Sequence, residues 1–158
     1  MIPPNHNLKR QTTSGNSMIP PAKKEHHREL PWFIRPFVVQ LLDVARDGHC
    51  GFRVAAHCLG IGKDRFLYVR QKLIEEIDFR RQFYLKEGTF LDFERDYQSL
   101  IVSSGAPCPP EKWMIMPTMA EPMENAFETP IFFFSERYSQ TTFPCFCPPN
   151  NNPPIFIA

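Results

Sequence analysis

A cysteine directly follows a short, turn-prone segment and directly precedes a run of residues that suits a helix. The segment is Asp47-Gly48-His49, the cysteine is Cys50, and the run begins with Gly51-Phe52-Arg53. A thiol at the start of a helix lies near the positive end of the helix dipole, which favours thiolate over thiol. The backbone N–H groups of Gly48, His49 and Cys50 could also stabilise an oxyanion. The pattern predicts a nucleophilic cysteine, and the alternative is a buried structural one.

Such a nucleophile needs a base that ionises the thiol and later protonates the leaving amine, and histidine usually does both. All the histidines lie at or before position 57: His6, His26, His27, His49 and His57. The side chain of His49 is expected to point away from its neighbour Cys50. His57 is about two helical turns, or ~10 Å, further along, beyond the ~3 Å reach of proton transfer. His26 and His27 fall on a polar arm that would not orient a base.

The flanking sequence predicts the elements that position this cysteine. A strand-like segment, Val38–Val44, leads into the turn, and a short buried helix follows Cys50 and ends near Gly60. A long amphipathic helix is expected over residues 66–87, with Gly88 ending it and with its charged residues, Arg70 among them, facing solvent. Its inward positions are expected to be Phe66, Val69, Leu73, Ile77 and Tyr84. A further helix is expected over residues 91–102.

The last third of the chain predicts one helix and a small sheet. Thr118-Met119-Ala120-Glu121 matches a capping box, so a helix is expected to begin at Thr118. The apolar run 131–134 predicts a central strand covered on both faces. Segments 141–143 and 155–158 predict further strands, and an unpaired apolar edge at the latter predicts low solubility. Together with the helices, this order predicts an α/β (α+β) domain.

Length and composition set the limits of these expectations. Of 158 residues, the first 29 are polar and predict a disordered arm, which leaves one domain over residues 30–158. A net charge of +1 gives no argument for binding nucleic acid or a membrane surface. No apolar run approaches the ~20 residues of a membrane helix. Trp32 and Phe33 are expected to cover one end of the core.

Cysteine usage predicts a reduced protein without a metal. Five unevenly spaced cysteines do not suit a disulfide framework, so an intracellular location, in cytoplasm or nucleus, is expected. Cys108, Cys145 and Cys147 raise the alternative of a zinc site. They lack the usual spacing of zinc ligands and have no histidine near them in sequence, so neither metal nor cofactor is expected.

The segment 47–53 resembles the signature of the ovarian-tumour (OTU) cysteine proteases. The sequence has Gly51 after the cysteine, and Trp113 and Met116-Pro117 downstream. In these features it is similar to OTU-like proteins of plant and fungal genomes, many of which are encoded in mobile elements. The resemblance covers residues 30–158. It implies a papain-like fold with a small central sheet flanked by helices. It also implies a thiol-dependent deubiquitinase, a hydrolase of the isopeptide bond after the C-terminal glycine of ubiquitin or a ubiquitin-like protein.

By motif position, the resemblance implies that Cys50 is the nucleophile and that Asp47 belongs to the oxyanion loop with the amides of Gly48, His49 and Cys50. The base of the family is a histidine just after the strand that begins at Ile155, and this sequence has none there. The expectation is therefore an OTU-like domain truncated before its last strand and histidine, inactive or very weak. The alternatives are a non-catalytic ubiquitin-binding or interaction module on the same fold, and a mobile-element remnant.

Overall fold

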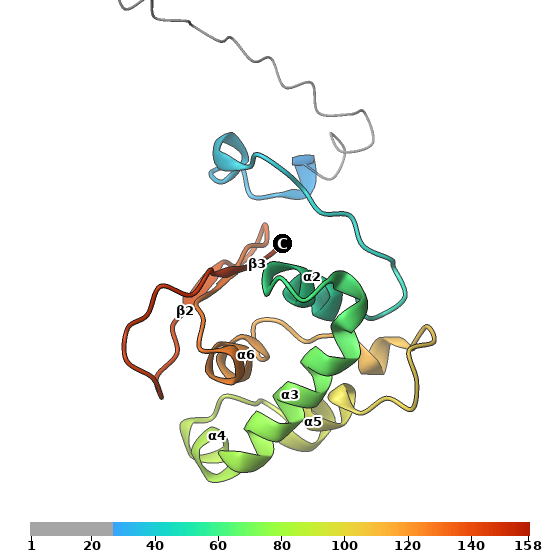
Figure 1. Cartoon of the computed structure of the whole chain (residues 1–158), viewed down its shortest axis with the longest axis vertical. Helices are drawn as coiled ribbons and strands as arrows, with labels where there is room; N and C mark the ends of the chain where they lie inside the picture. The colour runs from blue at the N-terminus through green and yellow to red at the C-terminus, as the bar shows by residue number, and fades with distance from the viewer. Residues whose placement is uncertain (1–26) are drawn as a thin grey trace, which may run out of the picture.

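A computed structural model describes residues 27–158, so the arm expected over residues 1–29 lies almost wholly outside it (Figure 1). The described part has an α+β fold. Its helices are η1 (Arg35–Phe37), α2 (Cys50–Cys58), η2 (Lys63–Arg65), α3 (Phe66–Phe79), α4 (Arg81–Glu87), α5 (Phe93–Leu100), η3 (Pro110–Lys112) and α6 (Ala120–Phe127). Its strands are β1 (Ile131–Phe133), β2 (Gln140–Thr142) and β3 (Ile155–Ile157).

The core lies between the helices and one face of the sheet. Helix α2 packs against β3 and α3, and α3 also contacts α5 and α6 (Figure 1). The five inward positions expected of the long helix are all buried, as are residues of α2, α6 and the strands: Phe52, Ala55, Ala56, Met123, Ile131 and Ile155. Burial of this apolar surface fixes α2, and with it Cys50, against the rest of the molecule.

The single helix expected over residues 66–87 is wrong, because two helices occupy this range. Arg80 lies between α3 and α4 with φ −113° and ψ 28°, outside the helical region. Its guanidinium forms an ion pair with Glu76 and lies 4.2 Å from the centroid of the Phe146 ring. The ion pair is local (i, i+4), whereas the contact with Phe146 is a tertiary one, which the period of the sequence does not record. Gly88 ends α4 in the left-handed conformation, as predicted.

The helix start expected at Thr118 is also wrong. The N-cap of α6 is Met119, and no side chain caps this end. Glu121, the other half of the expected capping box, instead accepts a hydrogen bond of 2.5 Å from Thr89 Oγ1, a residue that precedes α5. A long-range partner has therefore replaced the local one that the motif predicts.

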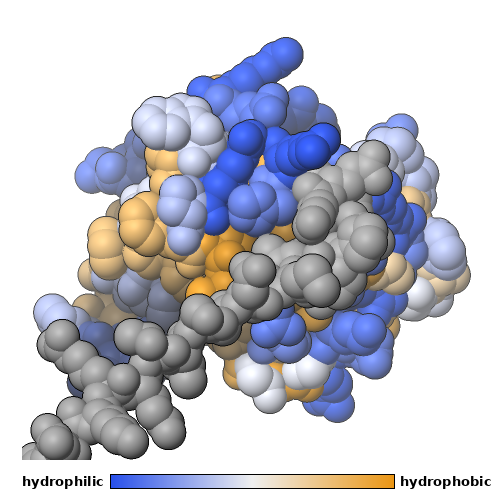
Figure 2. All heavy atoms as spheres, turned by 90° about the horizontal axis from the view of Figure 1, so that it is seen from above, coloured by the Kyte–Doolittle hydropathy of each residue, from blue (hydrophilic) through white to orange (hydrophobic). Residues whose placement is uncertain are grey.

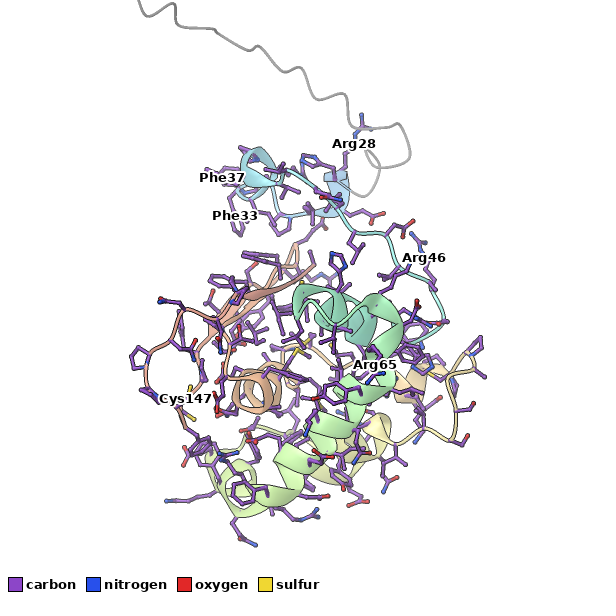
Figure 3. The ribbon with its side chains drawn as sticks, in the orientation of Figure 1. Arg28, Phe33, Phe37, Arg46, Arg65 and Cys147 are labelled. Carbon is purple, nitrogen blue, oxygen red and sulfur yellow. The ribbon has the colours of Figure 1, made fainter. Side chains whose placement is uncertain are left out.

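The strand expected over Val38–Val44 is absent, because this segment pairs with no strand in the described part of the chain. Val39 is 91% exposed. The expected cover of the core by Trp32 and Phe33 is wrong too, since they are 78% and 44% exposed, and Leu30 is buried instead. Figure 3 shows Phe33 on a segment that lies apart from helices α2 to α6. Figure 2 shows hydrophobic residues gathered near the centre of the face seen from above.

The sheet has the order β2-β1-β3 among the described residues. Strand β1 pairs antiparallel with β2, where Ile131 faces Thr142, and parallel with β3, where Ile131 faces Ile155. The central position predicted for β1 is confirmed. The prediction that both its faces are covered is wrong, because Phe132 stacks on Phe156, which is 52% exposed.

Candidate active site

Cys50 is the first residue of α2 and is exposed to solvent. The first main-chain bond of the helix runs from Arg53 N to His49 O at 2.9 Å. The N–H groups of Cys50 and of the next two residues therefore have no acceptor within the helix. Unpaired N–H groups and the helix dipole both favour an anion at this end. The site thus has the surroundings of a nucleophilic thiol on the N-terminal side of the helix.

Asp47 holds the turn before Cys50 in place. Its Oδ1 accepts the N–H of His49 at 3.0 Å, and its Oδ2 accepts Arg53 Nε and Nη2 at 3.2 and 2.7 Å. The hydrogen bond from Arg53 is the main reason why the pKa of Asp47 lies below its usual value, although burial acts in the opposite direction. Because the His49 amide is already paired, the oxyanion expectation now rests on the amides of Gly48 and Cys50.

Gly48 allows the turn to pack closely against the segment that follows α5. Its φ is +85°, and a Cβ at this position would lie 2.6 Å from both the carbonyl oxygen and Sγ of Cys108. Cys108 N donates to Asp47 O at 2.9 Å, and Trp113 Nε1 donates to Cys108 O at 3.3 Å. Only glycine combines this backbone conformation with so little space.

His49 faces away from Cys50, as the sequence predicted. Its ring is buried and stacks on Phe66 with 4.5 Å between ring centroids. Its Nε2 lies 3.0 Å from Ala106 O and its Nδ1 lies 3.0 Å from Arg70 Nη2. A carbonyl only accepts, so Nε2 carries the proton, and the lone pair of Nδ1 accepts the hydrogen bond from Arg70 Nη2. His49 is thus a packed residue of the turn, not the base of Cys50.

The other described histidines do not serve Cys50 either. His57 is exposed in the last turn of α2. His27 Nε2 lies 3.1 Å from Arg35 O. His6 and His26 lie outside the described residues. Within residues 27–158, no histidine is hydrogen-bonded to the Cys50 thiol, so this part of the chain gives the nucleophile no base.

Arg70 is the site residue that sequence reasoning missed. It was expected on a solvent-facing side of its helix, and it is buried instead. Its guanidinium lies 3.8 Å from the centroid of the Phe52 ring and donates to Ser99 O at 2.8 Å and to Lys112 O at 2.7 Å. Burial lowers the pKa of Arg70 to about 10. Arg70 therefore ties α3 to the turn before Cys50 and to the segments after α5.

The remaining cysteines do not form a metal site in the described part of the chain. No group of three or more histidine, cysteine, aspartate or glutamate residues is arranged there to hold a metal ion. Cys108 lies beside Gly48, whereas Cys145 and Cys147 lie on the loop between β2 and β3. Figure 3 shows Cys147 on this loop, at the outer edge of the molecule.

Comparison with known protein families and curated proteins finds no match to this chain. None of the helices between residues 27 and 158 has the length and apolar character needed to cross a bilayer. The features that bear on function are therefore the geometry around Cys50 and the resemblance of its motif.

Proposed function

We propose that this chain is an OTU-like, papain-like domain of the thiol-dependent deubiquitinase type, with Cys50 in the nucleophile position. Its target is the carbonyl after the C-terminal glycine of ubiquitin or a ubiquitin-like protein. The observation that carries the proposal is the exposed Cys50 at the start of α2, directly after a left-handed glycine turn. Asp47 pairs with Arg53 and accepts the His49 N–H, and these contacts support the turn that presents the thiol.

The site supports the first half of the reaction better than the second. Attack by the Cys50 thiolate places negative charge on the carbonyl oxygen, and the free N–H groups at the helix start can stabilise it. Collapse of that intermediate must protonate the leaving lysine amine, which needs a positioned acid. The described residues bring no histidine to Cys50, so we expect covalent capture of activated ubiquitin and very slow or no turnover.

A ubiquitin bearing a C-terminal electrophile tests the proposal. We expect slow formation of a covalent adduct at Cys50, identified by mass spectrometry and lost in Cys50→Ser. A chain that neither forms the adduct nor binds ubiquitin would refute the proposal. Rapid hydrolysis of ubiquitin chains would instead show that an acid–base group reaches Cys50, and that the expected low turnover is wrong.

A second candidate is a non-catalytic ubiquitin-binding module on the same fold. The engagement of His49 with Ala106 and Arg70 favours it, because the histidine next to the nucleophile serves packing. This candidate predicts that ubiquitin binding is the same in Cys50→Ala and in the unchanged chain. Calorimetry on both proteins measures this binding, and the adduct assay separates the two functions, since only the enzyme-type site forms a covalent adduct at Cys50.

A further inference from the structure

Trp113 is a half-exposed aromatic residue that lies against the turn before Cys50. It is 49% exposed. A Cβ at Gly48 would lie only 2.7 Å from its Nε1, so the edge of the indole ring is directly beside this glycine. The next residue, Met114, contacts Gly51 in the same way, because a Cβ there would lie 2.7 Å from its Sδ. Residues 113 and 114 therefore run alongside the glycines on both sides of Cys50.

Hydrogen bonds within the chain hold the Trp113 ring in place. Its indole N–H donates to Cys108 O at 3.3 Å. Cys108 N in turn donates to Asp47 O at 2.9 Å, and Arg70 Nη2 donates to Lys112 O at 2.7 Å. These bonds join the segment that carries Trp113 to the turn and to α3. An aromatic ring held in this way loses little conformational entropy when a ligand packs on it.

The position of Trp113 distinguishes it from other exposed apolar residues. Single exposed apolar side chains are common on protein surfaces and need no explanation by themselves. Trp113, however, contacts a glycine that is two residues from the exposed Cys50. A carbonyl attacked by Cys50 directs its oxygen to the free N–H groups at the start of α2. The residues that precede this carbonyl in the substrate then lie on the surface around the turn, where the exposed indole is available to them.

We propose that Trp113 is a substrate-contact residue of the Cys50 site, and that the glycine-ended C-terminal segment of ubiquitin or a ubiquitin-like protein packs on its ring. The inference rests on the proposed function, because it needs a substrate whose carbonyl Cys50 attacks. The contact is noncovalent, since the indole covers apolar and peptide surface of the segment and excludes water from it. Trp113 thus acts in substrate capture and does not change the reactivity of the thiol.

Two reactions of Cys50 separate substrate contact from support of the turn. A ubiquitin probe with a C-terminal electrophile uses the contact, whereas iodoacetamide is too small to need it. We expect Trp113→Ala to slow formation of the probe adduct at least about tenfold, while alkylation of Cys50 by iodoacetamide changes less than about twofold. Mass spectrometry of the Cys50 peptide measures both rates.

Two further variants serve as controls. Trp113→Phe keeps an aromatic ring and loses the hydrogen bond to Cys108 O, so the rate with the probe should stay within about threefold of wild type. Trp32→Ala removes the other tryptophan of the chain, which is 78% exposed and lies before the turn. We expect this variant to change neither rate by more than about twofold.

The possible outcomes separate the inference from the proposed function. If Trp113→Ala leaves the rate with the probe unchanged, the inference is overturned while the proposed function stands. If the variant slows both reactions alike, Trp113 supports the turn and contacts no substrate, which also overturns the inference. If the wild-type chain forms no probe adduct but is alkylated at Cys50, the proposed function fails, and the inference fails with it.

A fluorescence measurement decides the question even if circular dichroism shows that Trp113→Ala does not fold. In Trp32→Phe, Trp113 is the sole tryptophan, so the emission reports on its surroundings. Reaction with a ubiquitin probe that contains no tryptophan should shift this emission to the blue and reduce its quenching by acrylamide. Alkylation of Cys50 by iodoacetamide should change neither. Emission and quenching that stay the same in the ubiquitin adduct would overturn the inference.

Discussion

The negative charge of the Asp47 carboxylate stabilises the turn before Cys50, because it binds Arg53 and the His49 N–H. We expect Asp47→Asn to lower the free energy of unfolding by about 1.5–3 kcal/mol, the usual value of hydrogen bonds to charged groups. The control is Asp64→Asn. Asp64 also pairs with Arg53, at 3.1 Å, but its side chain is 84% exposed. We expect this control to change stability by less than about 1 kcal/mol, as measured by urea unfolding.

The effect of Asp47→Asn should depend on pH. The pKa of Asp47 is lower in the folded chain, chiefly because of Arg53. Its stabilising contribution is therefore fully present above the unfolded pKa of about 3.9 and is lost as pH falls through the folded pKa. The difference in free energy of unfolding between wild type and Asp47→Asn should stay constant near neutral pH and become smaller below about pH 4. A constant gap down to acid unfolding would contradict this role of Asp47.

Glu124 gives the opposite dependence on pH. It is buried in α6, its Oε2 has no hydrogen-bond partner, and burial raises its pKa to about 7. Between the unfolded value and about 7 the folded chain holds a proton that the unfolded chain has released. Stability should therefore fall by an amount on the order of 3 kcal/mol as pH rises through this window, and then level off.

The substitution Glu124→Gln should remove this slope, because the amide does not titrate. Urea unfolding of both proteins at several pH values between about 5 and about 8 measures it. Glu136→Gln is the control, since Glu136 is an exposed glutamate outside the core. A slope that survives in Glu124→Gln would show that another group causes it.

The turn from Asp47 to Cys50 is the element that joins α2 to the segment after α5. Gly48→Ala would place a Cβ 2.6 Å from two atoms of Cys108 and keep a φ of +85°. The matched control is Gly60→Ala, which has a φ of +72° and no atom within 4 Å of the new Cβ. In both variants an alanine must adopt the left-handed backbone conformation, which lowers the free energy of unfolding by roughly 1–2 kcal/mol.

Only Gly48→Ala adds a steric clash with backbone. We therefore expect it to cost at least about 2 kcal/mol more than Gly60→Ala in urea unfolding, as overpacking typically does. If Gly48→Ala and Gly60→Ala lowered the free energy of unfolding equally, the segment at Cys108 would be able to move away from the new Cβ without cost. In that case the close packing of the turn would not restrain Cys50.

At the scale of the whole molecule, β3 lies at one edge of the described sheet and carries an exposed aromatic side chain. Exposed, apolar edge strands favour association. We expect Phe156→Lys to raise the monomeric fraction at least about twofold in size-exclusion chromatography with light scattering, because Lys on an edge opposes strand pairing. Its stability should change by less than about 1.5 kcal/mol, since Phe156 is half-exposed.

The neighbouring position provides the control for this edge. Ile157 is 7% exposed, so Ile157→Lys would bury a charge and should unfold the chain. A wild-type chain that stays monomeric at high concentration would refute self-association through β3. In that event the aromatic pair of Phe132 and Phe156 would be an ordinary exposed contact.

The sequence alone determined those elements whose signals are local. Apolar periodicity predicted the buried positions of α3 and α4, and the continuous apolar run 131–134 predicted that β1 is the central strand. A glycine at position 88 predicted the end of α4, because its left-handed conformation suits a helix end. The turn-prone residues before Cys50 were likewise sufficient to predict a cysteine at a helix start.

Tertiary structure decided the rest, because partners far apart in sequence outweigh local preference. Arg70 reads as a surface charge by its helix position, yet carbonyls and a histidine from other segments satisfy it inside the molecule. Thr89 binds the carboxylate that the capping box would use, and Val38–Val44 pairs with no strand among residues 27–158. Likewise, only the folded chain brings Cys108 to His49 and Arg70, since these contacts span 59 and 38 residues.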